Sequence, residues 1–293
     1  MKNKELKPEI FDLYDEYAHN KIDRREFMEK LGIYAVGGLT IPSLLKYILP
    51  NYDNPDVLPD DVRIKVKTVS YDSPKGGGKI TGQLARPKGM GRKLPGIIVV
   101  HENRGLNPYI EDIGRRAAVE GFISIAPDAL SPLGGYPGSD DEGRAIQKKR
   151  DKSEMLEDFI AAFNYLKEHP RCDENIGVVG FCFGGWISNM MAVRVPELKA
   201  AVPFYGGQPK KAEEIAQINV PLLLQFAELD KRVNAGFPAY EAALKEHGKE
   251  YAAHIYPNAK HGFHNNTTPR YDEANTILAW ERTIDFFNKN LKA

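Results

Sequence analysis

The sequence contains the stretch Val178-Val-Gly180-Phe-Cys182-Phe-Gly184-Gly185-Trp186. Apolar residues typical of a strand precede Cys182, and a segment compatible with a helix follows it. Glycine stands two residues before and two residues after the cysteine, which is the G-x-nucleophile-x-G pattern of a sharp strand-to-helix turn. Such a turn strains its central residue and leaves no room for side chains at the flanking positions. The pattern predicts a reactive thiol at a helix N-terminus, where peptide dipoles favour thiolate; the alternative is an inert buried cysteine.

Strand-like and helix-like segments alternate along the chain from residue 62 onward. Two β-rich segments flank Ser73-Pro-Lys-Gly-Gly-Gly78 and predict an antiparallel hairpin. Further apolar runs, of the kind buried on both faces of a sheet, lie at 95–100, 122–126, 176–180, 200–204, 221–226 and 252–256. The alternation predicts an α/β protein with a doubly wound, mainly parallel sheet and helices on both faces. With the turn at Cys182, it indicates the α/β-hydrolase fold.

The first fifty residues differ from the rest of the chain. Arg24-Arg25 precedes an uncharged run at 31–45, which resembles a twin-arginine export signal. Acidic residues before the arginine pair, and the absence of an A-x-A cleavage site after the run, argue against processing. We therefore expect a cytoplasmic protein, or a periplasmic one if the signal functions.

The alternative for this segment is a helix that stays docked on the main domain. Asp23 would cap it, and Phe27, Leu31 and Tyr34 would share one face. We expect three parts in the chain. An N-terminal segment takes residues 1–50, a linker rich in Pro and Asp takes 51–61, and an α/β-hydrolase domain takes 62–293.

Composition narrows the classes of partner. The 293 residues include 40 Lys plus Arg and 40 Asp plus Glu, so there is no basic excess for nucleic acid or an anionic membrane. No run approaches the roughly 20 apolar residues of a membrane helix. We expect a small-molecule substrate, no nucleic acid, no membrane span, and a monomer or small homo-oligomer.

The two cysteines are expected to be free thiols. A predicted strand separates Cys172 from Cys182 and would hold them beyond disulfide reach. Cys172 is expected in the polar loop before that strand. No thiolate cluster for a metal is visible in the sequence, and we expect no cofactor.

Two further residues complete a possible catalytic triad with Cys182. The α/β-hydrolase fold places its nucleophile, acid and histidine in that order along the chain. Asp230 follows a predicted strand 48 residues after Cys182 (230 − 182), and His261 follows another strand 31 residues later (261 − 230). Glu228 and His264 are rivals for these two positions. Asp230 and His261 each lie at the carboxyl end of a predicted strand, where open α/β sheets form their binding and catalytic sites.

The chemistry requires these residue types. A thiol with a reference pKa of about 8.5 is mostly protonated at neutral pH, so a histidine must take its proton. A carboxylate then holds the imidazole in the right tautomer. An oxyanion hole is also required, and the backbone N–H groups of Phe183 and Asn103 are the candidates.

Several motifs, taken in order, resemble those of the dienelactone hydrolase (carboxymethylenebutenolidase) family. They are His101-Glu102-Asn-Arg-Gly-Leu106, Ala126-Pro-Asp128, Gly180-Phe-Cys-Phe-Gly-Gly185, Asp230 and His261-Gly-Phe263. The resemblance covers about residues 62–291. It implies hydrolysis of a small ester or lactone. It also implies that Glu102 contacts the resting thiol and swings away when substrate binds, which helps to generate thiolate.

The resemblance has gaps at the family's substrate-binding arginines. The chain continues after the histidine loop with His264-Asn265-Asn266, where an arginine is expected. Arg104, Arg144 and Arg232 are the substitutes that we consider, although a surface arginine is often only a solvated charge.

Two other classes of function compete with a hydrolase. A nicotinamide oxidoreductase would place a pyrophosphate at the Gly-rich turn, but Cys182 interrupts the G-x-G-x-x-G pattern at its second glycine. A noncatalytic binding protein could keep the fold without the activity. The complete set of triad residue types argues against it.

Overall fold

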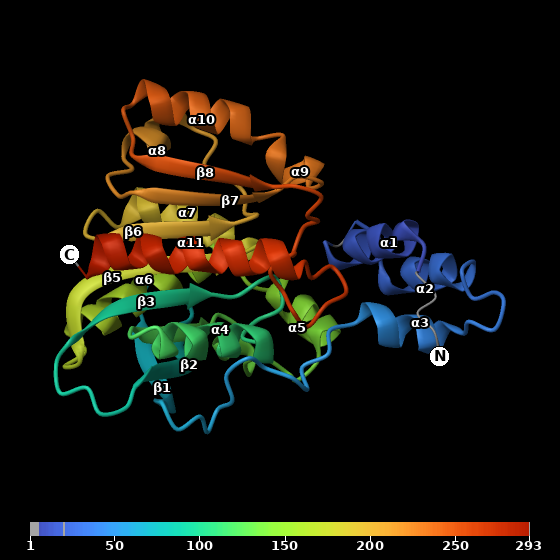
Figure 1. Ribbon diagram of the computed structural model, residues 1–293, viewed down its shortest axis with the longest axis horizontal. Helices are drawn as coiled ribbons and strands as arrows, with labels where there is room; N and C mark the ends of the chain where they lie inside the picture. Colours follow the sequence, from blue (N-terminus) through green and yellow to red (C-terminus); the bar gives the residue numbers. More distant parts are fainter. Residues whose placement is uncertain (1–5, 20, 293) are drawn as a thin grey trace.

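An eight-stranded sheet forms the body of the protein (Figure 1). The computed structural model describes residues 6–19 and 21–292. The strands are β1 (Ile64–Ser73), β2 (Gly78–Pro87), β3 (Leu94–Val100), β4 (Ile123–Asp128), β5 (Cys172–Phe181), β6 (Ala200–Phe204), β7 (Leu222–Ala227) and β8 (Tyr251–Tyr256). Their order in the sheet is β1-β2-β4-β3-β5-β6-β7-β8.

The strand directions confirm the predicted mainly parallel sheet. β1 and β2 form the antiparallel hairpin, and β2 is also antiparallel to β4. All other neighbouring strands pair in parallel. Every residue of β3 is buried, as expected for a strand covered on both faces. The carboxyl ends of β3 to β8 therefore meet at one edge of the sheet.

Helices cover both faces of the sheet, with a separate apolar cluster under each layer. One layer consists of α4 (Pro108–Val119) and α11 (Glu273–Leu291), which lie in front of the sheet in Figure 1. The other contains α6 (Lys152–Glu168), α7 (Phe183–Arg194), α8 (Ala212–Ala216) and α10 (Phe237–Glu246). Three short helices lie in loops: η1 (Ser131–Leu133), α5 (Asp140–Gln147) and α9 (Lys231–Asn234). Within the described residues, no helix combines the length and the apolarity needed to cross a membrane.

Three helices precede the sheet and form what we call the N-terminal unit: α1 (Pro8–Ala18), α2 (Arg24–Gly32) and α3 (Ile41–Ile48). The side chain of Asp23 accepts a hydrogen bond from the Glu26 N–H at 2.8 Å and so caps α2. The Phe27 ring stacks on Tyr17 at a centroid distance of 4.5 Å. The unit has its own apolar core, which includes Ile10, Leu13, Tyr14, Tyr17, Phe27, Leu31, Leu44 and Ile48.

The N-terminal unit lies beyond the carboxyl ends of the parallel strands, close to α5 (Figure 1). Leu31, Leu44 and the rest of the uncharged run at 31–45 are divided between α2, a connecting segment and α3. Export through Arg24-Arg25 remains a prediction.

The segment at 51–61 carries neither a helix nor a strand. It is nevertheless tied to the main domain at several points. The Asn51 N–H donates to the Thr267 carbonyl at 2.7 Å, and the Val57 N–H donates to Asp112 at 2.9 Å. The N-terminal unit is thus anchored to the domain through the chain that follows it.

The expected position of Cys172 is wrong. Cys172 is the first residue of β5, pairs with Leu94 of β3 and is fully buried in the core. The apolar run begins only at Ile176, because Asp173 and Glu174 occupy the first part of the strand at the end of the sheet. An apolar run therefore locates the buried middle of a strand better than its polar end.

We expect Cys172→Ala to lower the free energy of unfolding by about 1 kcal/mol, because it removes a small buried group and leaves a void beside Gly96. Urea unfolding measures this change. The hydrolytic rate per folded molecule should stay at the wild-type value, since Cys172 lies at the opposite end of β5 from Cys182. Unchanged stability would contradict the buried packing of this side chain.

Candidate active site

The turn after β5 holds Cys182 in a strained backbone conformation, with φ 57° and ψ −109°. Cys182 is half-buried and directly precedes α7. A Cβ at Gly180 would lie 2.0 Å from the Gly184 carbonyl oxygen, and one at Gly184 would lie 2.3 Å from the Val100 oxygen. Both approaches are too close for any side chain. The two glycines are therefore needed because the turn packs against the neighbouring backbone.

Asp230 and His261 form a hydrogen-bonded pair beside this turn. Asp230 Oδ2 lies 2.5 Å from His261 Nδ1, and both residues are buried. Asp230 follows β7 and caps α9, because its Oδ1 accepts from the Val233 N–H at 3.2 Å. His261 lies in the loop between β8 and α11. The pair thus comes from two neighbouring strand ends, where the sequence places it.

The two rival residues have other partners. Glu228 is exposed and accepts a hydrogen bond from the Asn258 N–H at 2.7 Å. His264 is buried among aromatic rings, and its Nδ1 lies 2.8 Å from the Tyr109 hydroxyl. The geometry therefore favours Asp230 over Glu228 and His261 over His264.

The Cys182 sulfur and a ring nitrogen of His261 lie within 4.8 Å of each other. Burial opposes ionisation of the Cys182 thiol. The positive charge of His261 and hydrogen bonds with His19 and His261 outweigh burial and lower its pKa to about 5. By contrast, burial raises the pKa of Cys172 to about 11. The environment thus favours thiolate at Cys182 and opposes it at Cys172.

The same interactions act on His261 in the opposite direction. Burial favours the neutral ring, but the negative charge of Cys182 and the hydrogen bond to Asp230 outweigh it and raise the pKa of His261. Both pKa shifts favour a thiolate beside an imidazolium.

His19, at the end of α1, also lies at this site, and the sequence analysis missed it. Its Nε2 is 3.8 Å from Cys182 Sγ and 3.3 Å from His261 Nε2. Asp15, one turn earlier, forms an ion pair with buried Arg270 at 2.8 Å. The Asn103 side-chain amide donates to the Ala18 carbonyl at 2.6 Å. The N-terminal unit therefore covers the nucleophile.

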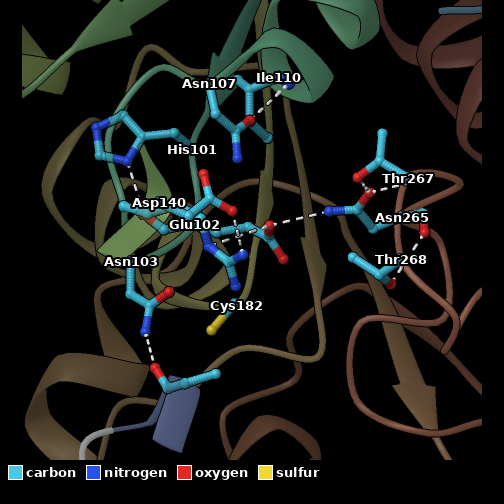
Figure 2. Close-up of polar contacts among 12 residues, drawn as sticks. His101, Glu102, Asn103, Asn107, Ile110, Asp140, Cys182, Asn265, Thr267 and Thr268 are labelled. Atoms are coloured by element: carbon cyan, nitrogen blue, oxygen red, sulfur yellow. Dashed lines mark hydrogen bonds and ion pairs between the residues drawn. The ribbon is translucent and has the colours of Figure 1, made fainter. Parts of the chain in front are cut away.

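Glu102 and Asn103 occupy the loop after β3 (Figure 2). Glu102 is buried, and its Oε2 accepts a hydrogen bond from the Asn265 amide at 3.2 Å. The same oxygen lies 3.9 Å from Arg104 Nε. Figure 2 shows this network above Cys182. Phe183 is the first residue of α7, so its N–H is one of the helix donors with no partner inside the helix.

The three arginines considered as substrate ligands differ in their surroundings. Arg104 is buried and pairs with Asp140 at 2.7 Å. Arg144 is also buried, pairs with Asp141 and lies over the Tyr17 ring. Arg232 is exposed, with Nη2 3.3 Å from His19 Nε2. Two of the three are therefore not solvated surface charges but parts of ion pairs.

A groove lies where the N-terminal unit meets α5, with a cavity volume of about 500 Å³. Its lining includes Tyr17, Arg24, Asp141 and Arg144. Cys182, Asp230 and His261 do not line it. The nucleophile lies under the N-terminal unit and outside this groove.

Comparisons with known proteins place the chain in a family. Residues 80–291 match the model of the dienelactone hydrolase family, and residues 1–36 match the YqhI-like model. A protein of Synechocystis sp. named as a candidate carboxymethylenebutenolidase is 31% identical over 246 residues, which cover 78% of this chain and 99% of that protein.

Solved structures agree with this assignment. A candidate dienelactone hydrolase of Klebsiella pneumoniae superposes with a TM-score of 0.68 at 25% identity, over 77% of this chain and 99% of that one. The dienelactone hydrolase of Anabaena variabilis has a TM-score of 0.61 at 19% identity, over 78% of this chain and 99% of that one, and supports the fold alone. The protein has the α/β-hydrolase fold. The chain belongs to the dienelactone hydrolase family and is a hydrolase, so the oxidoreductase alternative is wrong.

Proposed function

We propose that this protein hydrolyses a small carboxylic ester or lactone through Cys182, His261 and Asp230, with an acyl-enzyme intermediate. The observation that carries the proposal is the Asp230–His261 hydrogen bond of 2.5 Å, with His261 within 4.8 Å of the strained Cys182. Nucleophile, base and the group that orients the base are thus adjacent, as covalent catalysis requires.

In the first half of the reaction, Cys182 Sγ attacks the carbonyl carbon of the substrate. The C–O bond then breaks, and His261 donates a proton to the departing alkoxide oxygen. Asp230 keeps the His261 ring oriented and stabilises its charge. The products are an alcohol and a thioester on Cys182; for a lactone, the alcohol remains attached to the acyl chain.

In the second half, His261 takes a proton from water, and the resulting hydroxide attacks the thioester carbon. The C–S bond breaks, and the carboxylic acid leaves with restoration of the thiolate–imidazolium pair. Both tetrahedral intermediates need donors for their oxyanion. We assign the Phe183 N–H at the start of α7 and the Asn103 N–H to this role.

We further propose that Glu102 assists thiolate formation, as the family resemblance implies. Its carboxylate is held by Asn265 and Arg104 in this structure. The hydrogen bond to Asn265 supports this proposal, because it offers Glu102 a partner other than the thiol.

The acyl-enzyme is directly testable by rapid quenching of the reduced protein with an activated ester at low pH, followed by mass spectrometry. We expect one acyl group per chain, on the peptide that contains Cys182, and no acyl group on Cys172. Acylation at another residue would contradict the assignment of Cys182 as the nucleophile. Failure of the folded protein to acylate faster than a free thiol would favour a noncatalytic binding protein.

Substrate charge is a second expectation of this site. A substrate carboxylate needs a positively charged partner, but Arg104 and Arg144 are already paired with Asp140 and Asp141. Arg232 is exposed, so its contribution is screened by solvent. We therefore expect neutral short-chain esters to be hydrolysed at least as well as dienelactone, in kcat/KM.

A substrate panel checks this expectation, with Arg232→Ala as the variant. A dienelactone preference of about 100-fold or more, roughly 2.7 kcal/mol of differential transition-state binding, would refute it. If Arg232→Ala then removed that preference and left neutral esters unaffected, Arg232 would be the carboxylate ligand.

A further inference from the structure

Three potential metal ligands converge where the N-terminal unit meets the active site. His19 Nε2 lies 3.3 Å from His261 Nε2 and 3.8 Å from Cys182 Sγ, and all three ligand atoms lie within 4.8 Å of one another. His19 and Cys182 are half-buried, and His261 is buried. The ligands come from the end of α1, the turn after β5 and the loop after β8, so the chain must fold to bring them together.

A carboxylate lies near the Nδ1 atom of each imidazole, on the side away from the three potential ligand atoms. His261 Nδ1 lies 2.5 Å from Asp230 Oδ2. His19 Nδ1 lies 2.9 Å from the Asp15 carbonyl oxygen and 3.3 Å from the Asp15 carboxylate. When the rings are neutral, these partners place the hydrogen of each ring on Nδ1 and leave a lone pair on each Nε2 for a metal. A carboxylate behind the histidine is the usual support of a metal-bound imidazole.

Two neutral rings in this arrangement would repel each other. Each Nε2 would present a lone pair to the other at 3.3 Å, with the Cys182 sulfur beside them. A proton or a metal cation between these atoms removes the repulsion. The donor set of one thiolate and two imidazoles is the kind that binds zinc, whereas Mg²⁺ and Ca²⁺ require oxygen ligands.

The spacing also suits zinc. Zn–N bonds of about 2.0–2.1 Å and Zn–S bonds of about 2.3 Å in a tetrahedron require roughly 3.3–3.4 Å between nitrogens and roughly 3.5–3.6 Å between nitrogen and sulfur. The observed 3.3 Å between the two Nε2 atoms fits. The distances from Sγ to His19 Nε2, at 3.8 Å, and to His261, within 4.8 Å, must shorten when the ion binds.

We propose that His19, Cys182 and His261 bind one Zn²⁺, which ties the N-terminal unit to the active site. The ion takes the place of the proton that Cys182 and His261 share, which is released to solvent, and its fourth position remains for water. Bound zinc would coordinate the sulfur electron pair and His261 Nε2, so neither could react with a substrate. It would also hold His19 over Cys182. Zinc would therefore inhibit hydrolysis reversibly. This proposal goes beyond the proposed function, because zinc binding does not require turnover.

One charged neighbour opposes the ion. Arg232 Nη2 lies 3.3 Å from His19 Nε2 and must move away when zinc binds. Arg232 is exposed, so it can turn toward solvent. Arg232→Ala should therefore tighten zinc binding. The Asp15–Arg270 ion pair and the Asn103–Ala18 hydrogen bond hold α1 in place without the ion.

Zinc binding can be measured on the full-length, reduced and chelator-stripped protein by competition with a chromophoric chelator. We expect one zinc per chain. His19→Ala should weaken binding by more than about 100-fold, and Asp15→Asn by about 10- to 100-fold. His247→Ala is the matched control, because His247 is exposed at the end of α10, and it should bind zinc like the wild type.

Cobalt provides a readout that does not depend on activity. Co²⁺ in the same site should give thiolate-to-metal charge-transfer absorption, which Cys182→Ala should remove and Cys172→Ala should keep. Circular dichroism of each variant confirms that it is folded. Failure of the wild type to bind stoichiometric zinc, or equal affinity in folded His19→Ala, would overturn the proposal. Neither result would affect the acyl-enzyme on Cys182, so the two proposals fail separately.

Discussion

Cys182→Ala should abolish ester hydrolysis while the protein remains folded. Losing the nucleophile removes the covalent route, and the comparable loss in a well-characterised triad enzyme is on the order of 10⁶ in kcat. The change is small in volume, and alanine accommodates the positive φ of 57° no better and no worse than cysteine, so the fold should tolerate it. Steady-state hydrolysis of an activated ester measures the effect, with thermal unfolding on the same samples.

Cys172→Ala is the matched control for this experiment. Both variants remove one sulfur atom, but Cys172 lies at the start of β5 and Cys182 follows its end. The control should lose stability and keep its rate, whereas Cys182→Ala should lose its rate and keep most of its stability. Wild-type turnover by Cys182→Ala would rule out the thiol as nucleophile.

The sequence predicted the sheet well because its strands are buried on both faces. Apolar runs at 95–100, 200–204 and 221–226 lie within one residue of β3, β6 and β7. The predicted strand at 176–180 is shorter than β5, because the first residues of β5 include Asp173 and Glu174 and carry no apolar signal. The Gly180 and Gly184 pattern predicted the turn at Cys182, since close backbone approach tolerates no other residue there.

The role of the N-terminal unit could not be predicted in the same way. His19 and Cys182 are 163 residues apart, and no local pattern links them. The uncharged run at 31–45 favours a signal, and nothing in the residues around His19 indicates a role at a distant site. Tertiary contacts alone, such as Asp15 with Arg270, bring His19 to the site.

Arg270 shows a related limit of motif matching. The motif around His261 predicts an arginine soon after the histidine loop, and residues 264–266 contain none. The structure places buried Arg270 against this loop, where a Cβ at Gly262 would lie 3.3 Å from its guanidinium carbon. Its charge is paired with Asp15 of the N-terminal unit, so the arginine becomes free only if that unit moves.

The second large effect is expected for Asp230→Asn, which should lower kcat by up to about 10⁴ if tautomer control matters here as it does in serine proteases. The amide keeps an oxygen that can cap α9 at the Val233 N–H, so the helix should survive. An asparagine that donates to His261 Nδ1, however, would move the ring hydrogen to Nε2. An Nε2 that already carries a hydrogen cannot accept the proton of the thiol.

Glu228→Gln is the matched control, because it makes the same chemical change two residues earlier. Glu228 is exposed, and its partner is the Asn258 N–H rather than a histidine, so kcat should change by less than about 10-fold. Initial rates with a neutral short-chain ester, corrected for the folded fraction of each variant, give both numbers. If Glu228→Gln were the damaging change and Asp230→Asn the mild one, the acid would be Glu228, and His261 would have to turn toward it in the active conformation.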